Sequence, residues 1–149
     1  EVGGNAKMNE FQAAMGLLNL KYFDSEIEKR GKVAARYREN LSGIAGLSFR
    51  PVRQGATQNY AYLPVSFDPA VFGANRDQVN DALKQYGIIA RKYFYPLTSE
   101  AACYAGRFDP AQSPVAFTAS RNVLTLPMYA SLALPDVDDI CEIVAGCKK

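Results

Sequence analysis

The segment Arg-Lys-Tyr-Phe-Tyr at residues 91–95 combines charge with aromatic rings at the end of an expected strand. Arg91 and Lys92 are adjacent cations, and Tyr93 and Tyr95 carry hydroxyl groups on aromatic rings. Together such groups could hold a phosphorylated ligand that contains a ring. The alternative is an ordinary strand whose cations lay their aliphatic stems along apolar neighbours, and composition alone favours that alternative.

A second segment, Gly-Gly-Asn-Ala-Lys-Met at residues 3–8, stands directly before a helical pattern. Free N–H groups at the start of a helix can bind an anion, and the Asn5 amide and the Lys7 ammonium could add donors. A plain helix cap is the alternative, and it is the commoner use of such residues. The sequence alone leaves both alternatives open.

Catalytic and metal-binding sets are scarce in the rest of the chain. The 149 residues include no histidine, and the three cysteines lack the spacing of metal ligands. Ser-His-Asp and Cys-His nucleophile sets are therefore excluded. The 17 basic and 15 acidic residues are spread along the chain, so no nucleic-acid partner is expected. No apolar run reaches the ~20 residues of a membrane span, so we expect no membrane partner and a cytoplasmic protein.

Hydrophobic periodicity predicts the elements that must position these segments. Two helices are expected first, over residues 8–22 and 27–41, with a break at Asp24 and Ser25. Pro64 in the second expected strand favours an edge position or a bulge. The remaining elements are expected as strands at 47–49 and 59–67, a helix at 75–86, a strand at 88–95, an irregular segment at 96–121, a strand at 122–127 and a helix at 136–144. The sum is an α+β fold: two N-terminal helices followed by a small, mostly antiparallel sheet covered by helices.

Several motifs, in the same order along the chain, carry a resemblance to a known family. Residues 3–8 are similar to a Gly-x-Asn-x-Arg-Met segment in which Lys7 replaces the arginine, and residues 93–97 to a Tyr-x-Pro-Leu-His strand end in which Thr98 replaces the histidine. Residues 122–129 are similar to a Val-Leu-x-Leu-Pro-Met-Tyr strand. The chain thus resembles the C-terminal part of the DegT/DnrJ/EryC1/StrS sugar aminotransferases, pyridoxal-phosphate enzymes of the aspartate-aminotransferase fold type.

The resemblance implies a function for the parent enzyme. Such enzymes move an amino group, here expected to come from glutamate, to a nucleotide-linked keto sugar, and they act as homodimers. Residues 1–149 would form the small C-terminal domain, with a helical part at 8–44 and an α+β part at 45–149. The lysine that forms the Schiff base with the cofactor lies before the Gly-x-Asn segment in this family. It is therefore expected outside the printed sequence, and the chain alone is expected to bind no pyridoxal phosphate and to be inactive.

The resemblance also implies roles for individual residues. Asn5 corresponds to an amide that reaches the cofactor phosphate of the neighbouring subunit. Lys7, Arg91, Lys92, Tyr93 and Tyr95 are the candidates for substrate binding, and no catalytic residue is assigned within the chain. Thr98 puts in doubt any ligand contact that the family's histidine makes.

Two other functions remain possible on the sequence. One is a pyridoxal-phosphate sugar dehydratase of the same family, which keeps the fold but replaces the Schiff-base lysine. The other is a non-catalytic interaction domain that uses residues 8–44 as a dimerisation surface. Exposed apolar side chains on that segment would favour the second alternative.

Overall fold

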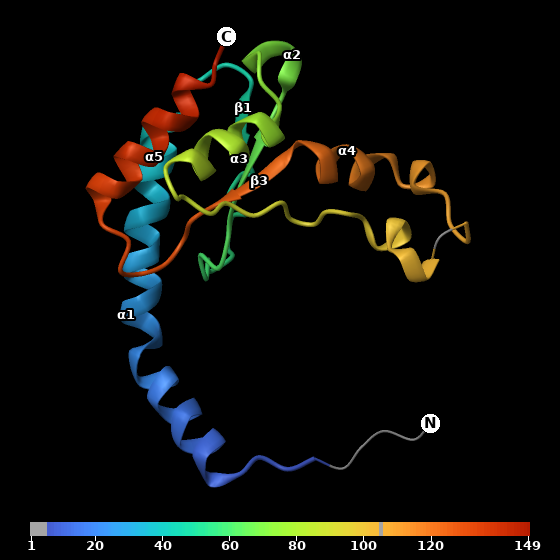
Figure 1. Cartoon of the computed structure of the whole chain (residues 1–149). Coiled ribbons are helices and arrows are strands. Elements are labelled where there is room, and N and C mark those ends of the chain that lie inside the picture. The colour runs from blue at the N-terminus through green and yellow to red at the C-terminus, as the bar shows by residue number, and fades with distance from the viewer. Residues whose placement is uncertain (1–5, 105) are drawn as a thin grey trace.

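A computed structural model of the chain describes residues 6–104 and 106–149 (Figure 1). Its helices and strands, in chain order, are α1 (Glu10–Leu41), β1 (Leu47–Phe49), β2 (Leu63–Phe67), α2 (Pro69–Phe72), α3 (Arg76–Gln85), α4 (Pro114–Asn122), β3 (Val123–Leu126) and α5 (Leu134–Gly146). Three single turns of 3₁₀ helix, Thr98–Glu100, Ala102–Tyr104 and Pro110–Gln112, lie between α3 and α4. The α+β fold class is confirmed.

The sheet has three antiparallel strands in the order β1-β2-β3. Pro64 lies in the central strand, so the expected edge position is wrong. The register explains why a proline fits there. Thr125 of β3 lies opposite Pro64, but its N–H and C=O bond to Arg91, on the side of β3 away from β2. The backbone nitrogen of Pro64 therefore points away from β3 and is not needed as a donor there. β1 ends opposite Val65, so no partner there needs the missing N–H of Pro64.

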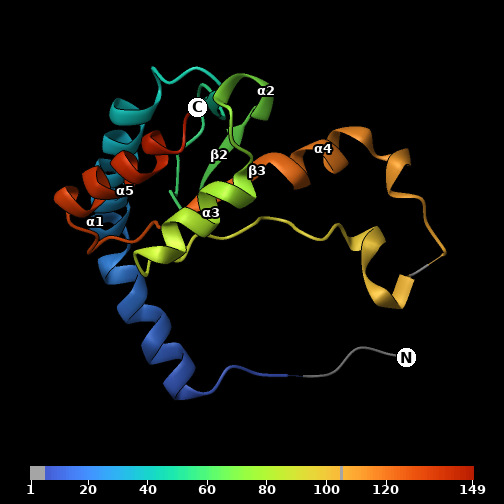
Figure 2. The ribbon, with the colours of Figure 1, turned by 45° about the horizontal axis from the view of Figure 1, so that its top comes forward.

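The core lies where α1, α3 and α5 pack together beside the sheet (Figure 2). Alternate residues of β2 are buried, and each of the three helices adds one apolar stripe. The contributing side chains include Val33, Tyr37 and Leu41 of α1, Val79 and Leu83 of α3, Leu124 and Leu126 of β3, and Val137 and Val144 of α5. Cys141 of α5 is also buried, which raises the pKa of its thiol to about 11.

The N-terminal third of the chain is one helix and not two. Asn9 caps α1 by accepting from the Gln12 N–H at 2.9 Å. Ser25, at the expected break, donates its hydroxyl to the Tyr22 carbonyl inside the helix. Neither aspartate nor serine breaks a helix as glycine or proline does, and ion pairs of Glu26 with Lys29 and of Glu28 with Lys32 support the next turns. The expected break is therefore wrong.

Three other expectations are also corrected. Residues 88–95 form no strand; Arg91 alone makes a bridge, to Thr125 of β3. Their aromatic side chains pack on one another and on nearby cations, as described below, in place of a longer ladder. Residues 96–121 are not irregular throughout, because Pro114 stands in the first turn of α4, where its fixed φ and missing N–H are tolerated. The strand expected at 59–67 begins only at Leu63.

No helix in residues 6–104 and 106–149 is both long and apolar enough to cross a membrane. In the longest, α1, charged residues are frequent from Lys21 onward, and its N-terminal half projects away from the sheet in both views (Figures 1 and 2). That half presents its large apolar side chains to solvent, from Phe11, which is 85% exposed, to Phe23. This length of helix has no packing partner among the described residues.

Candidate substrate-binding site

The first segment singled out in the sequence, residues 3–8, falls largely outside the described part of the chain. Asn5 lies there, so the structure gives no position for its amide. Lys7 is described and exposed, and it precedes α1 at the end of that helix remote from the sheet (Figure 1). The structure therefore does not bring Lys7 together with residues 91–95 within this chain, and its substrate contact stays a prediction.

A pocket of about 290 Å³ lies where residues 89–93 pass the ends of β2 and β3. We call it the site pocket; its lining includes Tyr62, Arg91, Tyr93, Thr125 and Tyr129. Arg91 Nη1 donates to Tyr93 Oη at 2.9 Å, and this bond is the main cause of a raised Arg91 pKa. The Tyr62 and Tyr93 rings meet edge to face with centroids 5.0 Å apart. The pocket wall therefore combines a cation bonded to a phenol hydroxyl with two phenol rings that contact each other.

The hydroxyl of Thr125 is the unusual group in this wall. Thr125 is 6% exposed, and its Oγ1 accepts or donates no hydrogen bond among the described residues. Among the described residues, Tyr37 Oη is the other buried side-chain atom that makes no hydrogen bond. Since a buried polar atom is normally paired, the Thr125 hydroxyl is a group that a ligand in the site pocket could satisfy.

Lys92 and Tyr95 turn away from the site pocket. Lys92 Nζ lies 2.6 Å from Asp77 Oδ1 at the start of α3, and this bond is the main cause of a lowered Asp77 pKa. The Tyr95 ring lies between the guanidinium groups of Arg76 and Arg121, at 4.6 and 4.7 Å from its centre. The four candidates of residues 91–95 thus divide: Arg91 and Tyr93 line the pocket, while Lys92 and Tyr95 fix the segment to α3 and α4.

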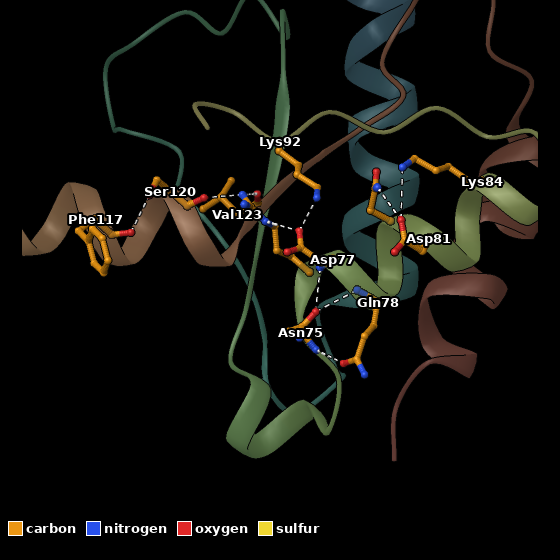
Figure 3. Close-up of polar contacts among 11 residues, drawn as sticks. Asn75, Asp77, Gln78, Asp81, Lys84, Lys92, Phe117, Ser120 and Val123 are labelled. Atoms are coloured by element: carbon orange, nitrogen blue, oxygen red, sulfur yellow. Dashed lines mark hydrogen bonds and ion pairs between the residues drawn. The ribbon is translucent and has the colours of Figure 1, made fainter. Parts of the chain in front are cut away.

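Arg76 anchors this second group, and Figure 3 shows Lys92 directed toward Asp77 beside it. Arg76 is 1% exposed and donates through Nη1 to the carbonyls of Ser120 and Val123 and through Nε to Asp77. Sequence reasoning missed Arg76. A usable signal was its spacing, because an arginine three residues before Val79 and seven before Leu83 falls on the apolar face of α3.

Glu100 completes the support of the segment. Its carboxylate pairs with Arg121 of α4 and accepts from the Leu97 N–H at 2.9 Å. Thr98, where the resembled family has histidine, is exposed in the 3₁₀ turn that Glu100 ends. The stretch from Arg91 to Glu100 is therefore tied to β3, α3 and α4 by separate polar contacts, which gives the site pocket a rigid wall.

Chemically the site pocket is suited to binding. Its lining includes a guanidinium and phenol hydroxyls, which recognise anionic and hydroxyl-rich ligands. In the part of the chain that the structure describes, no group of three or more His, Cys, Asp or Glu side chains could hold a metal ion.

The fold of the chain is similar to part of several solved aminotransferases. The structure of DesI in the presence of its TDP-sugar product matches with a TM-score of 0.87 and 32% identity, over 97% of this chain and 37% of that one. The sequence profile of the DegT/DnrJ/EryC1/StrS aminotransferase family matches residues 1–145. The chain belongs to this family.

Relatives of known activity agree with this assignment. The chain is 36% identical to dTDP-4-amino-4,6-dideoxy-D-glucose transaminase of Escherichia coli, over 97% of this chain and 39% of the relative. It is 32% identical to UDP-2-acetamido-2-deoxy-3-oxo-D-glucuronate aminotransferase of Pseudomonas aeruginosa, over 94% of this chain and 36% of the relative. The chain thus spans well under half the length of the relatives it matches.

Proposed function

We propose that this chain is the C-terminal part of a pyridoxal-phosphate-dependent aminotransferase that moves an amino group from glutamate to a nucleotide-linked keto sugar. The observation that carries the proposal is the site pocket, with Arg91, Tyr93 and the unpaired Thr125 hydroxyl, in a chain whose relatives act on dTDP- and UDP-linked sugars. Arg91 would bind an anionic or hydroxyl group of the substrate, and the pair of Tyr62 and Tyr93 rings, which contact each other, would pack against one side of a sugar ring.

We propose that this chain alone does not hold the cofactor. Pyridoxal phosphate, when bound to the whole enzyme, supplies the electron sink for amino-group transfer. Lys92, the lysine of residues 91–95, keeps its ammonium against Asp77 and lines no wall of the site pocket, so it does not fit as the cofactor's lysine. We assign no chemical step to this chain, and we propose that alone it binds substrate weakly and transfers no amino group. Asn5 stays a predicted contact to the cofactor phosphate of a neighbouring subunit.

We further propose that the enzyme is a homodimer. Support comes from Met8, just before α1, and from the N-terminal half of α1, where Phe11, Met15, Leu17 and Leu20, like Met8, are all more than half exposed. Apolar surface of this extent normally lies in an interface. The same observation favours the alternative that the isolated chain acts as an interaction domain through residues 8–44.

The test uses the whole enzyme that contains this chain, supplied with pyridoxal phosphate, glutamate and dTDP- or UDP-linked keto sugars. The expected result is release of 2-oxoglutarate with at least one of these sugars, and a raised KM for that sugar in Arg91→Gln. The matched control is Arg107→Gln, which removes an exposed arginine outside the site pocket. No 2-oxoglutarate from any of the sugars would overturn the aminotransferase proposal.

A further inference from the structure

A second pocket, of about 510 Å³, lies between α1 and the loop that joins β1 to β2. We call it the arginine pocket, because its lining includes Arg38, Arg50 and Arg53 and no aspartate or glutamate. Its volume is in the range that holds a ligand the size of a nucleotide. Ala61 and Tyr62 line both this pocket and the site pocket, so the two are neighbours on either side of Tyr62.

The three arginines carry charge that no carboxylate of residues 6–104 and 106–149 compensates. Arg36, Arg76 and Arg121 each pair with a carboxylate, whereas none of the three arginines of the arginine pocket has such a pair within the described ranges. Guanidinium groups gathered without acidic partners attract anions, and their planar donors match the oxygens of a phosphate. The charge of the pocket thus points to a ligand with more than one negative charge.

The pocket is partly fixed before any ligand binds. Arg38 Nη2 donates to the Arg50 carbonyl at 3.0 Å, and the Arg38 guanidinium lies 4.9 Å from the centre of the Phe49 ring. These contacts hold one cation in place and tie the start of the loop to α1. A preformed cation loses less entropy on binding than a free surface side chain.

An aromatic wall stands beside the cations. Tyr60 has a φ of 47°, an unusual value for a residue other than glycine, and its ring packs on α1 at Gly31. The side-chain amides of Gln58 and Asn59 belong to the same lining, and the Tyr62 ring closes it toward the site pocket. Rings and amides of this kind stack on nucleobases and bond to their edges.

We propose that the arginine pocket binds the diphosphate and the base of a nucleoside diphosphate. It would thereby hold the nucleotide half of the substrate while the sugar lies beyond Tyr62 in the site pocket, an inference that rests on the proposed function. Arg50 and Arg53 contact the phosphates, Arg38 holds the first turn of the loop, and Tyr60 stacks on the base.

The test is an NMR titration of the 149-residue chain with dTDP, UDP and inorganic pyrophosphate, with thymidine as the probe that lacks phosphate. We expect chemical-shift changes at Arg50, Arg53, Tyr60 and Tyr62 with the three phosphate compounds and weaker ones with thymidine. The double variant Arg50→Gln/Arg53→Gln should lower the affinity for dTDP and pyrophosphate at least tenfold. The control Arg107→Gln/Lys148→Gln removes the same charge from exposed positions elsewhere and should change affinity less than twofold.

A second variant separates stacking from charge. A Cβ at Gly31 would lie 3.2 Å from Cε2 of Tyr60, so Gly31→Ala moves that ring while it strengthens the helix. We expect dTDP to bind about threefold more weakly to this variant and pyrophosphate to bind as before. Equal affinity of the double arginine variant and the wild-type chain for dTDP would overturn the inference, and so would binding to Gly31→Ala that is unchanged for dTDP.

The outcomes also separate this inference from the proposed function. If dTDP binds at the arginine pocket but the whole enzyme releases no 2-oxoglutarate, the pocket stands and the aminotransferase proposal fails. If the whole enzyme transfers amino groups and Arg50→Gln/Arg53→Gln leaves the KM for the nucleotide sugar unchanged, the pocket assignment fails alone.

Discussion

The Arg76 guanidinium lies 4.6 Å from the centre of the Tyr95 ring, and this contact joins the interior of the domain to the segment that forms the site pocket. Arg76 is buried and bonded to the carbonyls of Ser120 and Val123 at the junction of α4 and β3. One side chain thus holds α3, the α4–β3 junction and residues 91–95 together. The position of the pocket wall that residues 91–93 form therefore depends on the contacts of Arg76.

Replacing Arg76 with methionine should destabilise the domain strongly. The variant keeps the apolar packing of the side chain but leaves two buried carbonyls without their donor, which costs about 2–4 kcal/mol of unfolding free energy. Urea denaturation followed by circular dichroism measures the change. Arg107→Met, at an exposed position, should stay within about 0.5 kcal/mol of the wild-type chain. A loss below about 0.5 kcal/mol for Arg76→Met would contradict the anchoring role.

Alanine substitutions at Gly46 and Gly55 should separate the cost of backbone strain from the cost of crowding. Both have positive φ, at 84° and 74°, so alanine is strained at either position by about 1 kcal/mol. At Gly46 the added Cβ would also lie 2.7 Å from the Cβ and 2.8 Å from the Cα of Phe72, whereas at Gly55 nothing lies within 4 Å. We expect Gly46→Ala to cost roughly 3 kcal/mol and Gly55→Ala roughly 1 kcal/mol in thermal or urea unfolding. Equal losses of unfolding free energy at the two positions would show that the folded chain moves Phe72 enough to remove the crowding.

The Lys92–Asp77 ion pair should give a small, pH-dependent contribution to stability. Its hydrogen bond lowers the pKa of Asp77 in the folded chain, so the contribution is present above the unfolded pKa of about 3.9 and is lost as the pH falls through the lower folded value. Asp77 is more than half exposed, so the contribution is below about 1 kcal/mol. The unfolding free energies of wild type and Asp77→Asn should differ at pH 7 and converge as the pH falls through that lower folded value. A difference that persists once the Asp77 carboxyl is protonated in the folded chain, as an NMR titration reports, would mean that the pair acts through packing and not through charge.

Local signals predicted the elements whose ends are marked by caps and turns. Asn75 and Gln78 form the capping box of α3, and Gly87 with a φ of 74° follows its end, as the sequence indicated. Leu47–Phe49 and the strand before Pro127 were also placed correctly, because each is short, apolar and bounded by turn residues. The family assignment followed from motif order and is confirmed by the match over residues 1–145.

The errors concern residues whose environment is set by distant parts of the chain. Residues 88–95 have the composition of a strand, but Tyr93 packs on Tyr62, and Tyr95 lies between arginines from α3 and α4. The local sequence pattern of residues 88–95 does not predict these distant partners. The burial of Arg76 is of the same kind, since an arginine on an apolar helix face is tolerated only because carbonyls of Ser120 and Val123 meet it. The arginine pocket likewise depends on a loop folding back on α1.

Thr125→Val should separate the folding role of Thr125 from its binding role. Valine has nearly the same shape and fits a strand well, and it removes a buried hydroxyl that has no partner among the described residues. The unfolding free energy should therefore stay the same or rise by about 1 kcal/mol, because an unpaired buried polar group is lost.

Substrate binding should respond in the opposite direction. In the whole enzyme the KM for the nucleotide sugar should rise about fivefold to tenfold, since Thr125 is among the residues that line the site pocket and a substrate group that bonds to its hydroxyl would lose one hydrogen bond. Thr125→Ser keeps the hydroxyl and should keep a KM close to that of the wild type. If Thr125→Val instead destabilises the chain by more than about 1 kcal/mol and leaves KM unchanged, the hydroxyl is satisfied within the folded chain and is not a substrate contact.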